Sequence, residues 1–307
     1  MLIIKKIGIL VILNALVLIN ANAEARTNIF TISPAIGFIY GHAEEIVYKY
    51  PDMNLYYSEL LWDLKPLFYA GFEADYGPRE PFRQNNFVAS ISFKYGFPLR
   101  TGTMENRDWL APSHNDLTHY SWHDAYSRGA FLLDVSIGHS WSFSNSLALT
   151  ACGEFSYKRL SWSGKDGQIQ LPPTSYIPEG EVIRYTQNWF ILAPGLSLNW
   201  KPALLFSIKG NLNYSPLIYC YARDDHWTNN LTFLDHLFLG HYFKGGGEFV
   251  FTPAKNLDFL LDISYTLMTG TRGHTYQNGV RIEKDAGAGY SAFDLGLAVK
   301  IQPFDRN

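Results

Sequence analysis

Two groups of acidic and histidine side chains, of the kind that hydrolases use, lie at the ends of segments in which apolar and polar residues alternate. Asp224 and His226 close one segment, and the acidic run Met104–Trp109 closes another far upstream. Side chains two residues apart in a strand share a face, so the Asp224 carboxylate can orient the His226 imidazole and hold it as a base. In a closed sheet the two groups would meet across the mouth, and the sequence therefore predicts a hydrolytic site there.

The composition is typical of a β-rich envelope protein. Of the 307 residues, 47% are apolar and 16% aromatic, while only 17% are charged. An aromatic excess of this kind suits strands and the aromatic girdles at membrane interfaces better than helices. The formal net charge of −3 gives no support to nucleic-acid binding.

The cysteines and histidines show no metal-ligand spacing. Cys152 and Cys220 are the only cysteines, and the nine histidines are scattered, so no metal site is expected. An even pair of cysteines in an exported protein permits a disulfide. Two buried or lipid-facing thiols are an equally good interpretation, and the sequence leaves the choice open.

The amino-terminal segment is typical of a signal peptide. Two lysines precede an apolar run, residues 7–19, and the small-residue sequence Ala21-Asn22-Ala23 follows it. We expect cleavage after residue 23, with Ala25 as the second choice. An uncleaved membrane anchor is the alternative, but the apolar run is short for a spanning helix. We therefore predict a signal peptide over residues 1–23 and one domain over residues 24–307.

The rest of the chain predicts an all-β fold, a ten-stranded antiparallel transmembrane β-barrel. Apolar and polar residues alternate in segments long enough to cross a bilayer as tilted strands, and charged residues, Gly or Pro interrupt every apolar run. An even number of strands is also what single-chain bacterial barrels have. The predicted strands cover residues 31–48, 58–76, 86–98, 130–143, 146–162, 187–200, 203–220, 238–252, 257–270 and 290–303.

The connections are predicted to alternate between short turns and long extracellular loops. Turn-forming residues predict hairpins at Gly77-Pro78, Ser144-Asn145, Lys201-Pro202 and residues 253–256. Polar stretches predict extracellular loops at residues 49–57, 99–129, 163–186, 221–237 and 271–289. Both acidic groups lie where strands enter long loops, so we expect them on the same outer side.

The chain resembles the omptin family of outer-membrane endopeptidases over essentially its whole length after the signal peptide. The resemblance rests on Gly37–Gly41 through Tyr48, on Met104–Trp109, and on Tyr214-Ser215 through Asp224-Asp225-His226. It implies a ten-stranded barrel in the bacterial outer membrane whose active groove faces outward. We accordingly expect a monomer that acts on polypeptide substrates.

The family's catalytic pattern implies a role for four positions. Omptins use an Asp-x-Asp couple facing an Asp-x-His dyad, with an attacking water between them. By position, Asp224 and His226 form the dyad and Asp108 is the second carboxylate of the couple. The first carboxylate falls on Asn106, which can donate a hydrogen bond but cannot titrate. We expect slower or altered hydrolysis, with complete loss of activity as the alternative.

The resemblance also implies a basic-residue preference and a lipid activator. Glu45 matches one of two acids that receive a basic side chain before the scissile bond, while the other falls at Ala222, which weakens the expected preference for Arg or Lys. Omptins need lipopolysaccharide, and Arg159 corresponds to one of the basic residues that bind it. The other basic positions are not recognisable, so lipid dependence stays open and Arg159 could instead anchor the barrel at the headgroups. No other cofactor is expected.

The residues Thr118-His119-Tyr120-Ser121, after Asp108, also resemble the omptin family. We expect His119, Ser121 and His123 to line the groove without a catalytic role. A triad of Ser121, His226 and Asp108 is a weaker alternative, because the sequence has no nucleophile elbow or oxyanion-loop motif.

Two further functions compete with the endopeptidase. A weakened omptin-like barrel acting as an adhesin or host-protein-binding surface protein is favoured by Asn106 and Ala222. A small porin is disfavoured, because side chains mostly fill the interior of a ten-stranded barrel.

Overall fold

The computed structural model describes residues 28–49, 55–78, 82, 86–111, 116–227, 230–254 and 256–301. The predicted signal peptide, residues 1–23, lies outside these residues. No helix in the described part of the chain is long and apolar enough to cross a membrane. The strand segments are β1 (Asn28–Tyr48), β2 (Tyr56–Pro78), β3 (Asn86–Gly96), β4 (Arg100–Asp108), β5 (His119–Ser144), β6 (Leu147–Leu171), β7 (Glu181–Ala203), β8 (Phe206–Ser215), β9 (Ile218–His226), β10 (Leu231–Phe238), β11 (His241–Ala254), β12 (Leu257–Thr269), β13 (Arg272–Gln277) and β14 (Val280–Ile301).

These fourteen segments form a ring of ten antiparallel strands in the part of the chain that the structure describes. Four strands consist of two segments in line, β3 with β4, β8 with β9, β10 with β11, and β12 with β13, because each neighbour pairs with both segments or with their continuations. Pro98 and Pro216, which have no N–H to donate, interrupt two of them. Leu239 and Gly270, with φ of 54° and 73°, interrupt the others. The predicted ten-stranded barrel is confirmed.

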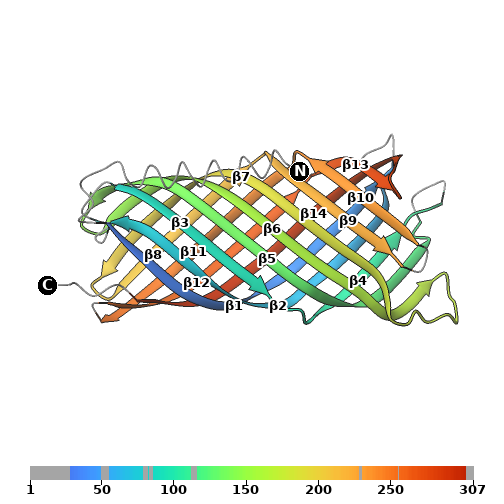
Figure 1. Cartoon of the computed structure of the whole chain (residues 1–307), viewed down its shortest axis with the longest axis horizontal. Helices are drawn as coiled ribbons and strands as arrows, with labels where there is room; N and C mark the ends of the chain where they lie inside the picture. Colours follow the sequence, from blue (N-terminus) through green and yellow to red (C-terminus); the bar gives the residue numbers. More distant parts are fainter. Residues whose placement is uncertain are drawn as a thin grey trace.

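Pairing between the first and last strands closes the ring. β1 and β14 are antiparallel partners from Ile32 opposite Ile301 to Val47 opposite Ala286. Closure leaves no strand edge in the hydrocarbon, where an unpaired N–H or C=O would have no water to bond. The strands run obliquely to the long axis of the barrel (Figure 1).

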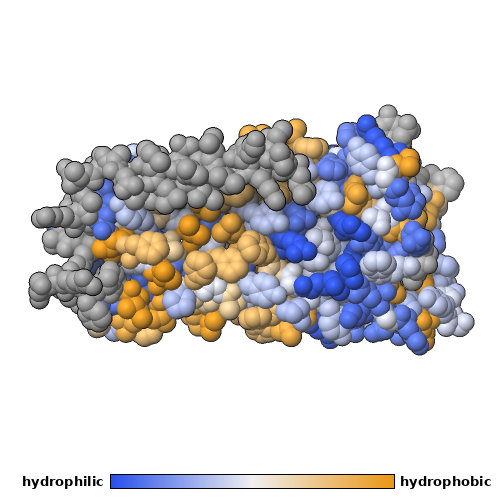
Figure 2. Space-filling model, viewed as in Figure 1, coloured by the Kyte–Doolittle hydropathy of each residue, from blue (hydrophilic) through white to orange (hydrophobic). Residues whose placement is uncertain are grey.

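The outer wall changes character along its length. On β1 the outward side chains Phe30, Ile32, Ile36 and Tyr40 are all half exposed or more, whereas His42 and Glu44 follow at the outer end. Figure 2 shows apolar side chains gathered on the left half of the barrel and hydrophilic ones on the right half. In Figure 1 the right half carries β4, β9, β10 and β13. The left half is the membrane-spanning part, and the right half extends into water.

The prediction of long extracellular loops is wrong over most of their length. The stretches 99–129, 163–186, 221–237 and 271–289 are largely strand, because β4, β9, β10 and β13 and the ends of β5, β6, β7 and β14 occupy them. Above the membrane the outward face meets water and the buried inward face mixes polar with apolar residues, so the alternation that identifies a membrane-spanning strand is weakened. The extended wall brings side chains to the outer end in regular register.

The structure also tests the predicted hairpin at Lys201-Pro202 and the possible disulfide between Cys152 and Cys220. The hairpin expected at Lys201-Pro202 turns at Leu204-Leu205 instead, because the pairing of β7 with β8 continues to Ala203 opposite Phe206. Cys152 and Cys220 are free thiols, so the disulfide that the sequence permitted is not formed.

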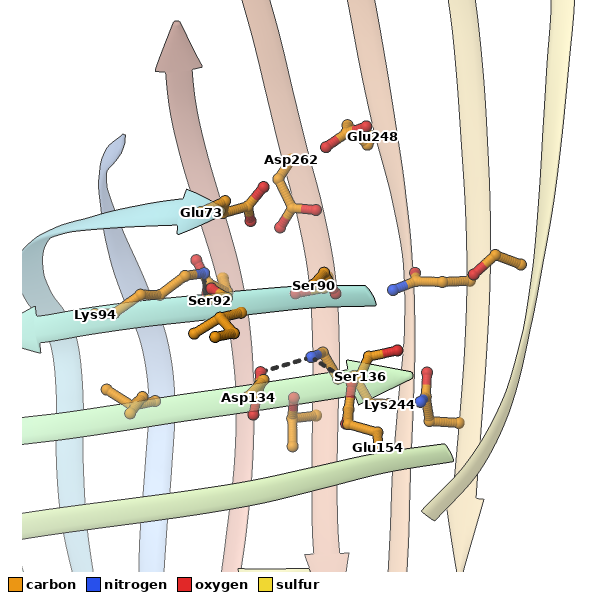
Figure 3. Close-up of a pocket in the computed structure, with 18 of the residues that line it drawn as sticks. Glu73, Ser90, Ser92, Lys94, Asp134, Ser136, Glu154, Lys244, Glu248 and Asp262 are labelled. Atoms are coloured by element: carbon orange, nitrogen blue, oxygen red, sulfur yellow. Dashed lines mark hydrogen bonds and ion pairs between the residues drawn. The ribbon is translucent and has the colours of Figure 1, made fainter. Parts of the chain in front are cut away.

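The membrane-level interior holds charged side chains in mutual contact. Lys244 Nζ lies 2.8 Å from Asp134 Oδ2 and 3.5 Å from Glu154 Oε2, and Lys94 Nζ lies 2.5 Å from Asp294 Oδ2. Figure 3 shows Lys94, Asp134, Glu154 and Lys244, from β3, β5, β6 and β11, pointing into the barrel. Together with Asp294 they line a cavity of about 140 Å³. Pairing offsets much of the cost of placing charges inside the barrel.

An aromatic layer separates this charged interior from the outer end. Trp62 stacks on Tyr185 with ring centroids 5.8 Å apart and on Trp162 at 6.0 Å. These rings and that of Trp189 are at most 1% exposed. They belong to β2, β6 and β7, so the layer spans the ring and fills the interior as expected for a barrel of this size. The filled layer argues against the porin alternative.

Replacing Trp62 by Ala should therefore lower the free energy of unfolding by about 3–5 kcal/mol, because a large ring leaves a cavity in the layer. Urea unfolding of the refolded barrel, followed by far-UV circular dichroism, measures the change. Tyr176→Ala is the control, since Tyr176 is 58% exposed and should change stability by no more than about 0.5 kcal/mol. Equal effects of the two substitutions would contradict a packed layer.

Candidate active site

The predicted dyad is formed at the outer end of β9. His226 Nε2 is hydrogen-bonded to Asp224 Oδ2, as expected for side chains two residues apart on one face. The Asp224 side chain is 2% exposed, whereas that of His226 is 31% exposed. With Nε2–H donating to the carboxylate, Nδ1 is the lone-pair nitrogen of the neutral ring. The buried acid orients the imidazole, and the imidazole reaches solvent.

The charges around His226 favour its protonated form. Burial alone lowers the pKa of His226, but the hydrogen bond and charge of Asp224, together with the charge of Asp108, raise it above its usual value. Asp108 belongs to β4, four strands around the ring from β9. Its effect on His226 means that the two predicted groups face each other across the mouth of the barrel.

The opposite wall holds the second predicted pair on β4. Asn106 Nδ2 donates to Asp108 Oδ2 at 3.3 Å, and Ser58 Oγ on β2 donates to Asp108 Oδ1 at 2.6 Å. Each carboxylate oxygen of Asp108 thus has a donor that fixes its orientation. Ser58 was not foreseen from the sequence; it is the cross-strand neighbour of Asp108, a relation that only the strand register reveals.

Glu45, the predicted substrate-binding acid, lies directly against the dyad. Burial raises its pKa well above the usual range, and the charges of Asp224 and Asp235 add to the effect. Glu45 Oε2 and Asp224 Oδ1 are both buried without an N–H or O–H donor. One proton shared between the two carboxyl groups satisfies both oxygens, and the raised pKa of Asp224, due first to burial, agrees with such sharing.

The residues after Asp108 that were expected to line the groove take different places on β5. His123 is hydrogen-bonded through Nδ1 to the carbonyl of Asp166, and its Nε2 lies 3.2 Å from Ser121 Oγ. Burial lowers the pKa of His123. The Ser121 hydroxyl therefore has a partner other than His226, which leaves the triad alternative without geometric support. His119 is exposed and bonded to Thr118, so it belongs to the rim.

Arg159 is not part of this site. It lies on the outward face of β6 and is exposed, between Phe131 on β5 and Asn188 on β7. Its position on the outer wall is compatible with a contact to lipid headgroups.

Sequence reasoning missed Asp235 on β10. It is 3% exposed, and burial first, then the charge of Asp224, raises its pKa to about 7. Asp235 fell inside a stretch predicted as a loop. The alternation of Asp235 and Leu237 with outward neighbours is the signal that could have identified an inward acid.

The fold and the site together define a class of protein: a bacterial outer-membrane β-barrel with a polar, partly buried site at its outer end. A family model described as the Omptin family matches residues 26–301, and the chain belongs to the omptin family. The predicted family is thereby confirmed, as are the predicted location in the bacterial outer membrane and a site that faces outward.

The fold is similar to that of a solved outer-membrane structure. The crystal structure of the outer membrane protease OmpT from Escherichia coli matches with a TM-score of 0.78 and 16% identity, covering 90% of this chain and 97% of that chain. The transport unit of the autotransporter AIDA-I from Escherichia coli reaches a TM-score of 0.36 at 10% identity, covering 93% of each chain. The translocator domain of the autotransporter NalP from Neisseria meningitidis reaches 0.36 at 9% identity, covering 93% of this chain and 90% of that chain. No curated protein matches the sequence.

The facing walls predict how the pKa of His226 responds to substitution. Asp108→Asn should lower it, because a negative charge that stabilises the imidazolium is removed, and Asn106→Asp should raise it by adding such a charge. Titration of the ¹³C-labelled histidines by NMR in the refolded barrel measures both shifts. The pKa of His123 is the internal control and should stay constant, because Asp166, not Asp108, acts on it. A His226 pKa that ignores both substitutions would contradict the facing arrangement.

Proposed function

We propose that this omptin barrel is a surface endopeptidase, acting as a monomer, that hydrolyses peptide bonds with a water activated by the Asp224–His226 dyad. The observation that carries the proposal is a partly exposed imidazole on β9, hydrogen-bonded to a buried carboxylate, with Asp108 on the facing wall close enough for its charge to act on the ring. A base and a second polar anchor on opposite sides of one gap are what water activation requires.

In this mechanism His226 Nδ1 removes a proton from the water that attacks the peptide carbonyl. Asp224 stabilises the imidazolium through the Nε2–H bond, and Asp108 on the opposite wall accepts a hydrogen bond from the O–H that the attacking water keeps. The imidazolium then protonates the leaving amine when the tetrahedral intermediate collapses. The products are a free carboxylate and a free amine, and His226 returns to its neutral form.

Asn106 changes the balance of this mechanism. One of its N–H groups is committed to Asp108 Oδ2, and the second can donate to the developing oxyanion. The site carries one negative charge fewer than an Asp-x-Asp couple, so the imidazolium is less strongly stabilised. We infer a slower hydrolysis than such a couple would support.

A non-catalytic surface protein, an adhesin built on the same barrel, is the second candidate. The specific observation in its favour is again Asn106, whose amide is already bound to Asp108 and cannot titrate. In this interpretation the dyad is a remnant and the outer rim binds host protein.

Cleavage of a mixed peptide library by residues 24–307, refolded in detergent, separates the two candidates. We expect cleavage by the wild type, a loss of about 10²- to 10⁴-fold in kcat/KM for His226→Ala, and a gain for Asn106→Asp. Tyr176→Ala, far from the dyad in sequence and exposed, is the matched control and should cleave normally. No cleavage by the wild type, with cleavage by Asn106→Asp, would favour the adhesin.

We further propose that lipopolysaccharide activates the barrel through contacts that include Arg159. The exposed guanidinium on the outer wall can pair with lipid phosphates. Lipopolysaccharide should therefore raise the cleavage rate of the wild type, and Arg159→Gln should need a higher lipid concentration for the same rate. The comparison is a lipid titration of the two proteins under identical conditions. Superimposable titration curves would remove Arg159 from the lipid site.

A further inference from the structure

The inner face of β10 continues the dyad with apolar side chains. Leu231 is paired directly with His226, and Phe233 with Asp224, on the antiparallel ladder between β9 and β10. Side chains that oppose each other in such a ladder lie on the same face of the sheet. The Phe233 ring also meets the His226 ring edge to face, with centroids 5.6 Å apart and ring planes at 78°. Leu231 and Phe233 therefore border the imidazole inside the mouth of the barrel.

Two apolar side chains of β14 extend this surface. Gln277 on β13 is paired with Phe233 on one side and with Val280 on the other. Thr275, which is buried inside the barrel, is paired with Ile282. These ladders place Val280 and Ile282 on the inward face together with Phe233. We call this surface the apolar wall, which consists of Leu231, Phe233, Val280 and Ile282.

The apolar wall is open to water. Val280 is 68% exposed, and Leu231, Phe233 and Ile282 are each partly exposed. Leu237, which lies farther down the same face of β10, is completely buried. Apolar side chains that gather on an open surface next to a polar site mark a place where another molecule binds.

The hairpin that carries half of the apolar wall is held in place. β13 and β14 are joined by Asn278-Gly279, whose φ angles of 48° and 85° suit a two-residue hairpin turn. The Asn278 N–H donates to the Thr232 carbonyl on β10, and the Thr232 N–H donates to Asn278 Oδ1, both at 2.9 Å. The wall is therefore formed before a ligand arrives, which lowers the entropic cost of binding.

The position of the apolar wall selects the polypeptide substrate as its occupant. The wall faces the mouth rather than the lipid, on strands that lie side by side with β9 at the right end of the barrel (Figure 1). Because neighbouring strands lie about 4.8 Å apart, β10 lies about 5 Å and β14 about 14 Å from β9. An extended peptide advances about 3.3 Å per residue. A peptide whose scissile carbonyl lies at His226 thus brings the side chains of the next one to four residues to the wall.

The groove is apolar on one side only. The facing wall on β4 presents Asn106 and Asp108, and these two side chains are hydrogen-bonded to each other. An apolar side chain of the substrate therefore has a favourable place beside β10 and β14 and none beside these β4 groups.

We propose that the apolar wall is a subsite for an apolar side chain of the substrate, within two residues of the scissile bond. The inference rests on the proposed endopeptidase function and adds a feature to its substrate class, namely a Leu-like, Val-like or Phe-like residue close to the cut. Leu231 and Phe233 contact the side chain nearest to the dyad, and Val280 and Ile282 cover its outer side.

The test uses Gly/Ser peptides that contain one Arg and, at one of the four positions nearest to it, either Leu or the nearly isosteric Asn. At one of these positions the wild type should cleave the Leu peptide with about tenfold higher kcat/KM, as burial of most of a leucine side chain provides. Phe233→Ser should reduce this Leu-to-Asn ratio by about fivefold or more, and Leu231→Thr should act in the same direction.

Leu234→Thr is the matched control for Leu231→Thr. Leu234 has the same residue type on the same strand but lies on the opposite face, since Phe233 and Asp235 face inward. Its Leu-to-Asn ratio should stay at the wild-type value. Migration of unheated samples on SDS gels verifies that each variant is a folded barrel. Folded Phe233→Ser and Leu231→Thr with unchanged ratios, or an equal loss in Leu234→Thr, would overturn the subsite and leave the endopeptidase intact.

Binding measured without catalysis distinguishes failure of the subsite from failure of the proposed function. The substitution Asp108→Ala removes a group of the facing wall and leaves the apolar wall unchanged. In this background, fluorescence anisotropy should show tighter binding of the labelled Leu peptide than of the Asn peptide, and Phe233→Ser should abolish the difference. If the wild type cleaves no peptide but this difference is present, the endopeptidase is wrong and the subsite stands. If the Leu and Asn peptides bind alike at all four positions, the subsite is wrong.

Discussion

The requirement that every backbone N–H and C=O in the membrane be bonded within the chain is the constraint on which this structure depends. Pairing β1 with β14 meets it by closing the sheet, and a closed ring fixes which strands face each other. β4 and β9 then lie on opposite walls, so Asp108 can act on His226 although 118 positions of sequence separate them. The Asp224–His226 pair is local, but its position opposite Asp108 is a consequence of closure.

The buried charged side chains have different partners in the membrane-spanning part of the barrel and at its outer end. In the membrane part, lysines and acids are paired, as Lys244 is with Asp134, and their mutual attraction offsets the cost of burial. At the outer end, the charges that act on the buried Glu45 are those of two other acids, Asp224 and Asp235. The aromatic layer around Trp62 separates the two levels, so the lysines of the interior do not neutralise the acids above. The acids that pair with lysines support the membrane-spanning part of the barrel, whereas the acids at the outer end belong to the candidate site.

Much of the membrane-spanning fold was predictable because lipid on one side and a polar interior on the other impose a period of two. The predicted strand over residues 31–48 matches β1 to within a few residues. The predicted strand over residues 290–303 ends within a few residues of the end of β14 but begins ten residues later than β14 does, because the outer part of β14 lies above the membrane. The same logic failed from residue 221 to residue 237. There the inward face is buried but carries acids such as Asp224 and Asp235, and the outward face meets water, so the apolar–polar alternation is weak and predicts a loop where β9 and β10 stand.

The sequence by itself determined the Asp224–His226 dyad, because strand geometry places residues two apart on one face whatever the rest of the chain does. It also determined that Asn106 stands beside Asp108 without a titratable group. Only the tertiary structure decided that Ser58 holds Asp108, that Glu45 lies beside Asp224, and that Asp235 lies across from Ala222. These relations depend on strand register and ring closure, which arise from hydrogen bonds between distant segments and leave no local trace in the order of residues.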